Sequence, residues 1–308
     1  MELKSRLLFA FVLIASLPIR GFPAEVLRVV TTTTDLADMV KAVGGDKVVI
    51  KSLSLGTQDI HLVEPRPSMV MQVKRADMLV RLGMDLDLWA QSLIDAARNS
   101  KVMYGGRGYL DASQGIEKLQ VPAGKVDMRM GDIHIYGNPH YWLDPTNANL
   151  ILESITDRLC QLLPSGETYF RHNYQQYAAE IDSAISEWHR IMGPFAGAKI
   201  VTYHNSWIYF AERFNLQIVE YVEPKPGIPP TPSHIASLIE KMKEEQVKVI
   251  VIEPYFNLRA AETVADRTGA RILILPSSVG GVKGTNSYLE LFDYIIEQLA
   301  EAFSIQGG

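Results

Sequence analysis

Three of the seven histidines stand where a side chain could bind a ligand. His61 lies in a loop after an apolar run, in "GTQDIHLVEPRPS", and His204 lies where another apolar run ends, in "IVTYHNSW". His140 lies between a proline and two aromatic residues, in "IYGNPHYWLDP". Neutral imidazoles are good ligands for zinc. The three are far apart and show no HExxH or CxxC pattern, so spacing alone leaves a shared metal site and three separate hydrogen-bonded histidines both open.

The other four histidines carry weaker signals. His172 and His189 lie among charged and polar residues of a long amphipathic segment, which is typical of solvated or interfacial side chains. His234 follows "TPS", a typical helix start, and no chemistry is assigned to it. His134 lies with two aspartates in "VDMRMGDIHIYGNPH". A second metal site in that loop and a polar loop at the edge of a cleft are both open.

The elements that must position these histidines repeat in two halves of the chain. Short apolar or β-branched runs alternate with helical segments. In the first half the runs are "VLRVVTTTT", "KVVIKSLS", "ADMLVRLG" and "KVMYGG"; in the second they are "AKIVTYH", "LQIVEYVE", "VKVIVIEP" and "RILILPSS". Runs this apolar are typical of parallel strands buried on both faces. We therefore expect two α/β lobes, each with about four parallel strands.

The predicted sheets bring the candidate histidines toward one place. In open α/β sheets, ligands bind beyond the carboxyl ends of the strands. His61 and His204 follow strands of their own lobes, and a loop of the first lobe could bring His140 to them. The residues alone thus predict a possible three-histidine site between the lobes.

A long helix is expected to join the lobes. Aromatic and apolar residues recur every three or four positions in "GETYFRHNYQQYAAEIDSAISEWHRIM", which predicts one helix of about 25 residues. The expected boundaries are a first lobe over 25–165, a linking helix over 166–193 and a second lobe over 194–308. A helix of this length would act as a rigid spine and favour small lobe rotations.

The first 24 residues have the pattern of a cleaved signal peptide. Lys4 and Arg6 precede an apolar run that is too short to span a bilayer. The segment contains no cysteine, so no lipid anchor is expected on it. The chain has a formal net charge of −5, which makes a nucleic-acid partner a poor candidate. The single cysteine, Cys160, lies on the apolar side of a predicted helix and has no partner for an internal disulfide.

Seven segments give the chain a resemblance to a known family. They are "VVTTTTDLADMV", "HLVEPRPS", "ADMLVRLGMDLDLW", "GNPHYWLDP", "TYHNSWIYFAERF", "PGIPPTPSHIASLI" and "VIEPYF". In this order they resemble the zinc- and manganese-binding proteins of ABC transporters, the cluster 9 periplasmic solute-binding family. The resemblance implies two Rossmann-like lobes with parallel sheets, joined by one long rigid α-helix. It also implies a monomer in the periplasm that delivers metal to a membrane permease and is not an enzyme.

The resemblance implies that His61, His140 and His204 bind one metal ion between the lobes. Pro139 and Trp142 would then fix the presentation of His140. Asp144 would either orient that imidazole or cap the following turn.

The fourth ligand is where the chain departs from the family. Many members have an aspartate after the last strand of the second lobe, and here Ser277 or Ser278 stands near that position, in "LILPSSVGG". The fourth ligand would be water or Glu253 of "VIEPYF", with Asp59 a weaker candidate. A purely structural role for the Glu253 carboxylate stays open as well.

Three imidazoles favour Zn²⁺ over Mn²⁺, because manganese prefers oxygen ligands. The expected function is high-affinity zinc binding for import. The alternatives are a Mn²⁺-selective receptor of the same family, a three-histidine zinc hydrolase with Glu253 as general base, and a surface adhesin with a structural metal.

Overall fold

The computed structural model describes residues 25–124 and 134–306. The expected signal peptide over 1–24 and most of the loop before His134 lie outside the described residues. No helix in the described part of the chain combines the length and the apolar character needed to cross a membrane.

The first lobe is a parallel sheet covered by helices. Its strand order is β2-β1-β3-β4, and every pairing is parallel. The strands are β1 Leu27–Thr31, β2 Val48–Ser52, β3 Met78–Arg81 and β4 Tyr109–Asp111. The helices are α1 Thr34–Gly44, α2 Pro67–Lys74, α3 Trp89–Ala97 and α4 Asn147–Leu162. The apolar side chains of β1 and β3 are buried in two clusters, one on each side of the sheet, as the apolar runs predict.

The second lobe repeats this arrangement with the strand order β6-β5-β7-β8, again all parallel. The strands are β5 Lys199–Thr202, β6 Gln217–Tyr221, β7 Val249–Ile252 and β8 Arg271–Ile274. The helices are α6 Ile208–Arg213, α7 Pro232–Glu244, α8 Arg259–Thr268 and α9 Tyr288–Gln306. The predicted fold class, two parallel-sheet α/β lobes, is therefore confirmed.

One predicted strand is wrong. The run "KVMYGG" over 101–106 forms turns, and the fourth strand of the first lobe is the next segment, Tyr109–Asp111. Gly105 has a φ of +78°, and a Cβ on Gly106 would lie 2.5 Å from the backbone oxygen of Lys101. These glycines fold the chain tightly on itself and keep the run out of the sheet.

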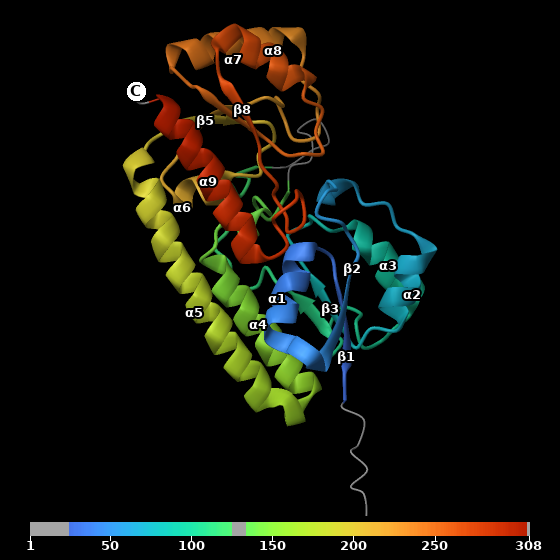
Figure 1. Cartoon of the computed structure of the whole chain (residues 1–308). Coiled ribbons are helices and arrows are strands. Elements are labelled where there is room, and N and C mark those ends of the chain that lie inside the picture. Colours follow the sequence, from blue (N-terminus) through green and yellow to red (C-terminus); the bar gives the residue numbers. More distant parts are fainter. Residues whose placement is uncertain (1–24, 125–133, 307–308) are drawn as a thin grey trace, which may run out of the picture.

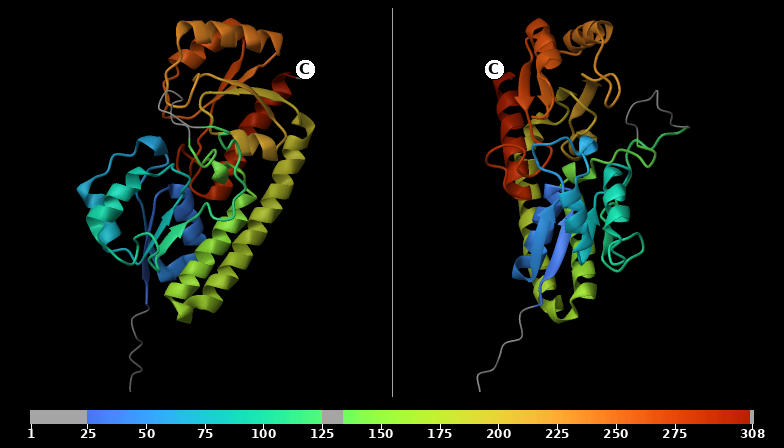
Figure 2. Two further views of the ribbon diagram at one scale, coloured as in Figure 1. Left: turned by 180° about the vertical axis from the view of Figure 1, so that it is seen from behind. Right: turned by 90° about the vertical axis from the view of Figure 1, so that its right-hand side faces the viewer.

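Helix α5, Glu167–Met192, runs along both lobes, from α1 and α4 of the first lobe to α9 of the second (Figure 1). Phe170, Ile181, Trp188 and Met192 of its predicted stripe are buried. The Trp188 ring stacks on Phe292 of α9 at 5.0 Å, and its Nε1 donates a hydrogen bond to Asp293. The predicted long helix joining the lobes is confirmed, and its stripe is packing surface. Figure 2 shows α5 along both lobes from two further directions.

A second connection ties the lobes at the start of α1. Thr34 Oγ1 donates to the carbonyl oxygen of Val279 at 2.7 Å, and Asp35 Oδ1 accepts from the Val279 amide at 2.9 Å. Asp38 Oδ2 accepts from the Tyr288 amide at 2.9 Å and from the Tyr177 hydroxyl of α5 at 3.1 Å. The segment after β8 is thus held by the first lobe as well as by its own.

Candidate metal centre

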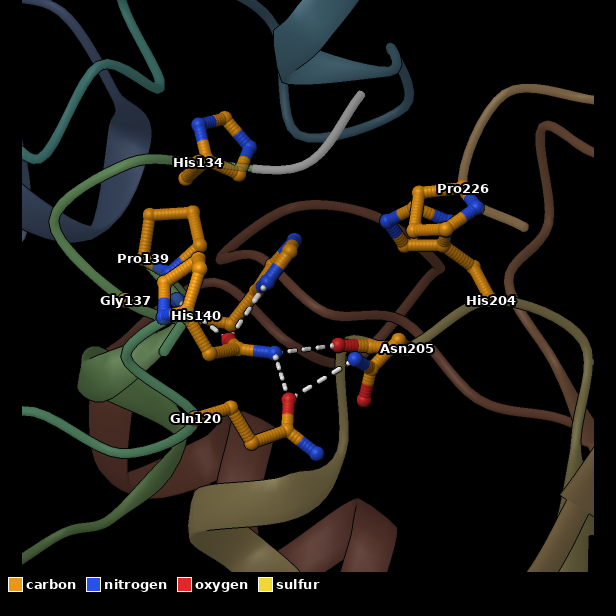
Figure 3. A pocket seen from close by; sticks show the side chains of 10 residues that line it. Gln120, His134, Gly137, Pro139, His140, His204, Asn205 and Pro226 are labelled. Atoms are coloured by element: carbon orange, nitrogen blue, oxygen red, sulfur yellow. Dashed lines mark hydrogen bonds between the residues drawn. The ribbon is translucent and has the colours of Figure 1, made fainter. Parts of the chain in front are cut away.

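A pocket of about 370 Å³ opens between the lobes, and His134, His140 and His204 are among its lining residues (Figure 3). A polar bridge crosses it. Asn138 of the first lobe donates to the backbone oxygen of Asn205 at 2.8 Å and to Gln120 Oε1 at 3.1 Å. Asn205 also donates to Gln120 Oε1, at 2.8 Å. Because Asn205 follows His204 directly, this bridge fixes one lobe against the other beside two of the candidate ligands.

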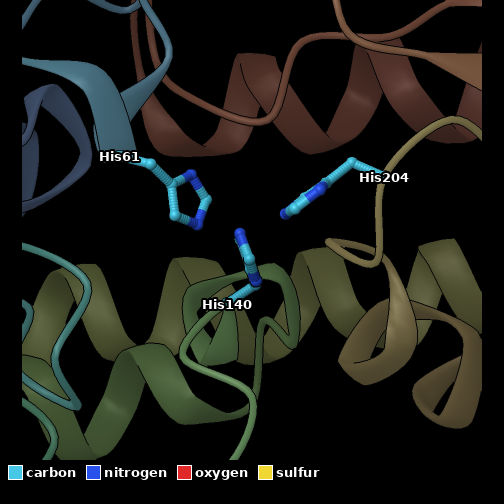
Figure 4. A group of neighbouring side chains, drawn as sticks. All are labelled: His61, His140 and His204. Atoms are coloured by element: carbon cyan, nitrogen blue, oxygen red, sulfur yellow. The ribbon is translucent and has the colours of Figure 1, made fainter. Parts of the chain in front are cut away.

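The three predicted histidines meet at this place. His61, His140 and His204 each offer one ligand atom, and these atoms lie within 4.8 Å of one another (Figure 4). Their ring centroids are 5.1 to 5.4 Å apart. His61 lies in the 3₁₀ turn Ile60–Leu62, His140 precedes the 3₁₀ turn Tyr141–Leu143, and His204 follows β5. The first lobe supplies two imidazoles and the second lobe one.

The two histidines of the first lobe are oriented by the same local device. Asp59 Oδ1 accepts from the backbone amide of His61 at 2.9 Å and contacts its Nδ1 at 2.8 Å. Asn138 Oδ1 does the same for His140, with both distances 3.0 Å. In each case an Asp or Asn stands two residues before the histidine, where an Asx turn brings its oxygen onto both nitrogens.

His204 is oriented by a distant residue instead. Its Nδ1 lies 2.9 Å from Glu223 Oε2, just beyond the end of β6, the parallel neighbour of β5. Glu223 is buried and also accepts from the Gly227 amide at 3.1 Å.

Trp142 adds a packing contact on His140, with ring centroids 5.3 Å apart, and its Nε1 donates to the Ser277 carbonyl oxygen at 2.7 Å.

These contacts fix which nitrogen of each imidazole faces the centre. An oxygen acceptor beside Nδ1 favours the neutral tautomer with its proton there, which leaves Nε2 with a free lone pair. All three rings have such an acceptor, and their other nitrogens converge (Figure 4). The arrangement is the one by which proteins present histidines to a metal ion.

The pKa values of His140 and His204 are shifted in opposite directions. Burial, together with the neighbouring His61 and His204, lowers the pKa of His140 well below its usual value. Burial also opposes a charge on His204, but the hydrogen bond to Glu223 and the nearby carboxylates of Glu253 and Asp59 raise its pKa. A proton therefore competes with the metal more strongly at His204 than at His140.

The candidate fourth ligands lie elsewhere. Within the described residues, the group of close ligand atoms contains the three histidines and no carboxylate. Glu253 Oε1 accepts from Ser206 at 2.6 Å and from Trp207 at 3.1 Å, whereas its Oε2 is buried without a hydrogen bond. Burial raises the pKa of Glu253 to about 7. The Ser277 hydroxyl lies 3.2 Å from Tyr255 Oη.

The contacts of Asp144 and Asp59 decide between the roles expected for each of them. Asp144 Oδ1 accepts from the amide and hydroxyl of Thr146, and its carboxylate pairs with Arg213 at 2.8 Å. Asp144 is therefore a turn residue and an ion-pair partner, and Asn138 orients His140. Asp59 orients His61, and although burial opposes its ionisation, the hydrogen bond from His61 lowers its pKa.

His134 stands beside the three histidines without belonging to their group. Its ring centroid is 5.5 Å from that of His61, and its Nε2 is buried with no hydrogen bond. Burial, together with the nearby His61 and His204, lowers its pKa to about 3. The two aspartates of the predicted loop lie outside the described residues.

Comparison with known proteins places most of the chain in one family. The family model of zinc-uptake complex component A, periplasmic, matches residues 29–302. The iron-binding protein YfeA of Yersinia pestis is 24% identical, with 91% of this chain and 87% of YfeA covered. The manganese ABC transporter substrate-binding lipoprotein PsaA of Streptococcus anginosus is 26% identical, with 90% of this chain and 89% of PsaA covered.

A solved crystal structure of ZnuA has the same fold. It superposes with a TM-score of 0.76 at 22% identity, and the match covers 90% of this chain and 99% of that one. The two lobes and the long helix are therefore shared with a protein of low sequence identity.

Proposed function

Because the chain belongs to the family of periplasmic zinc-uptake component A proteins, we propose that it is a zinc receptor of a metal ABC importer. Its ion is held by Nε2 of His61, His140 and His204. The observation that carries this proposal is the convergence of three imidazoles from both lobes, each with an oxygen acceptor on Nδ1.

The donor set supports zinc over manganese. Imidazole nitrogens suit zinc, whereas manganese prefers carboxylate, carbonyl and water oxygens. The close ligand atoms of the described residues are all imidazole nitrogens. The relatives named for iron and manganese make those metals the alternatives that a binding test has to include.

We assign the fourth position to water from the pocket between the lobes. Glu253, the protein alternative, lies outside the close group and has one oxygen engaged by Ser206 and Trp207. An open position on a three-histidine zinc also occurs in hydrolases. Binding and delivery are favoured here because the matching relatives are transporter receptors. The receptor acts as a monomer that meets its membrane permease.

A competition titration tests the proposal. Metal-stripped protein is titrated with Zn²⁺, Mn²⁺ and Fe²⁺ against a chelator of known affinity. We expect one zinc per chain with a Kd in the nanomolar range or below, and manganese at least about 100-fold weaker, in line with three imidazole ligands.

Two variants identify the residues that bind. His140→Ala removes one imidazole and should weaken zinc binding by at least about 100-fold. His172→Ala is the matched control, because that histidine lies on α5, away from the close group. Tighter binding of manganese than of zinc, or equal zinc affinity in both variants, would overturn the proposal.

A further inference from the structure

A second groove lies on the second lobe between α7 and α8, with a volume of about 670 Å³. Its two walls differ in chemistry. On the α7 side, Ile235 and Ile239 line it, and on the α8 side, Arg259 and Arg267. Tyr203, which precedes His204, lines it as well. The groove thus combines an apolar wall, a basic wall and an aromatic side chain.

The basic wall stands out in an acidic chain. Arg259 and Arg267 are eight positions apart on α8, which places them on one face of the helix. Both side chains are exposed, and neither guanidinium forms an ion pair with the described residues. Glu262 and Asp266 also lie on α8 but do not line the groove, whose charged lining residues are the two arginines in a chain with a formal charge of −5. Such a site is complementary to carboxylates on a partner.

Two aromatic rings connect the groove to the metal centre. The Tyr203 ring stacks on Phe256 with centroids 4.5 Å apart, and the Phe256 ring lies 5.9 Å from that of His204. A chain seated in the groove would lie against Tyr203, whose stacking partner Phe256 contacts a candidate metal ligand. This position suits a partner that must be recognised next to the ion.

We propose that the α7–α8 groove docks an acidic segment of the membrane permease, anchored by an apolar side chain between Ile235 and Ile239. Arg259 and Arg267 bind its carboxylates. The two arginines are exposed and Ile235 and Ile239 are half-buried, so charged and apolar groups meet in one concave site, as is typical of binding hot spots. The inference rests on the proposed function, because it needs an importer to which the receptor delivers its ion.

The test compares two charge-reversal variants of the full chain in cells that lack their own copy of it. R259E/R267E reverses the basic wall. K51E/R75E is the matched control, since both of its side chains are exposed on the first lobe and the change in charge is the same. Zinc affinity of each purified variant is measured by competition titration, and uptake of radioactive zinc is measured in the cells.

We expect R259E/R267E to bind zinc like the wild type and to lower uptake at least about tenfold, while K51E/R75E changes neither. Unchanged uptake in R259E/R267E would overturn the inference. An equal loss in both double variants would overturn it too, because net charge rather than the groove would then matter.

Vesicles of phosphatidylglycerol separate the permease from the membrane surface as the partner. We expect the wild-type protein not to sediment with them at physiological salt. Sedimentation that R259E/R267E abolishes would assign the arginines to lipid and contradict docking on a protein. Failure of the proposed function is distinguishable from all of these outcomes, because the wild type would then bind no zinc or support no uptake.

Discussion

Glu223 should control zinc affinity without touching the ion. Its Oε2 lies 2.9 Å from His204 Nδ1, and the carboxylate is buried. In Glu223→Gln the acceptor loses its charge, so the imidazole becomes a weaker donor to the metal and is less firmly oriented. The loss of such an acceptor typically weakens metal binding by about 10- to 100-fold. This corresponds to about 1.4 to 2.7 kcal/mol.

The size of the effect should depend on pH. In the wild type, burial works against a charge on His204, but the hydrogen bond to Glu223 raises its pKa, so protons compete with zinc as the pH falls. Glu223→Gln removes that influence and lowers the pKa of His204. The affinity ratio of wild type to variant should therefore be largest near pH 8 and shrink near pH 6.

A competition titration at both pH values measures this ratio. Glu220→Gln is the matched control, because Glu220 lies on β6, three residues before Glu223, and pairs with Lys241 at 2.9 Å rather than with a histidine. A change of less than about threefold near pH 8 would refute the argument that Glu223 tunes the ligand. A ratio that is the same at both pH values would refute the assignment of the competing proton to His204.

Three further predictions concern Glu253, Asp35 and the stabilisation of the fold by zinc. Glu253→Gln should leave the zinc Kd within about threefold of the wild type if water holds the fourth position, and a loss above about 100-fold in the same titration would make Glu253 a ligand. Burial raises the pKa of Asp35 to about 7 from 3.8, so this carboxyl's contribution to stability is full below about pH 3.8 and is lost as the pH rises through about 7. Between about pH 5.5 and 8.5, urea unfolding should show that Asp35→Asn gains about 2 kcal/mol relative to the wild type, and parallel pH profiles would contradict this. Zinc at about 100 times Kd should raise the free energy of unfolding by about 2.7 kcal/mol in the wild type and much less in His140→Ala, as thermal or urea unfolding can measure.

The positions of the candidate ligands could be predicted from the sequence because a general rule of parallel sheets places them. Parallel strands deliver the residues that follow them to one edge of the sheet, so His61 and His204 could be expected at the cleft. The joining helix was equally predictable, because apolar residues that recur every three or four positions indicate an amphipathic helix. Neither rule depends on contacts between distant residues.

The groups that orient the histidines were harder to predict. Asn138 had a local signal, since it stands two residues before His140 just as Asp59 stands two residues before His61. That shared spacing points to both residues, whereas Asp144, a candidate for orienting His140 from its place in the sequence, pairs with Arg213. Glu223 had no local signal, because its contact with His204 depends on the pairing of β5 with β6. The turns over 101–106 were missed because glycine geometry overrode the β-branched and aromatic residues of that run.

Zinc K-edge X-ray absorption of the protein loaded with one equivalent of zinc tests the central claim most directly. We expect the scattering of three imidazoles and one oxygen, with Zn–N distances of about 2.0–2.1 Å. His140→Ala, loaded in the same way, should lose one imidazole. A wild-type spectrum with two or fewer imidazoles, or one that His140→Ala leaves unchanged, would contradict a site built from His61, His140 and His204.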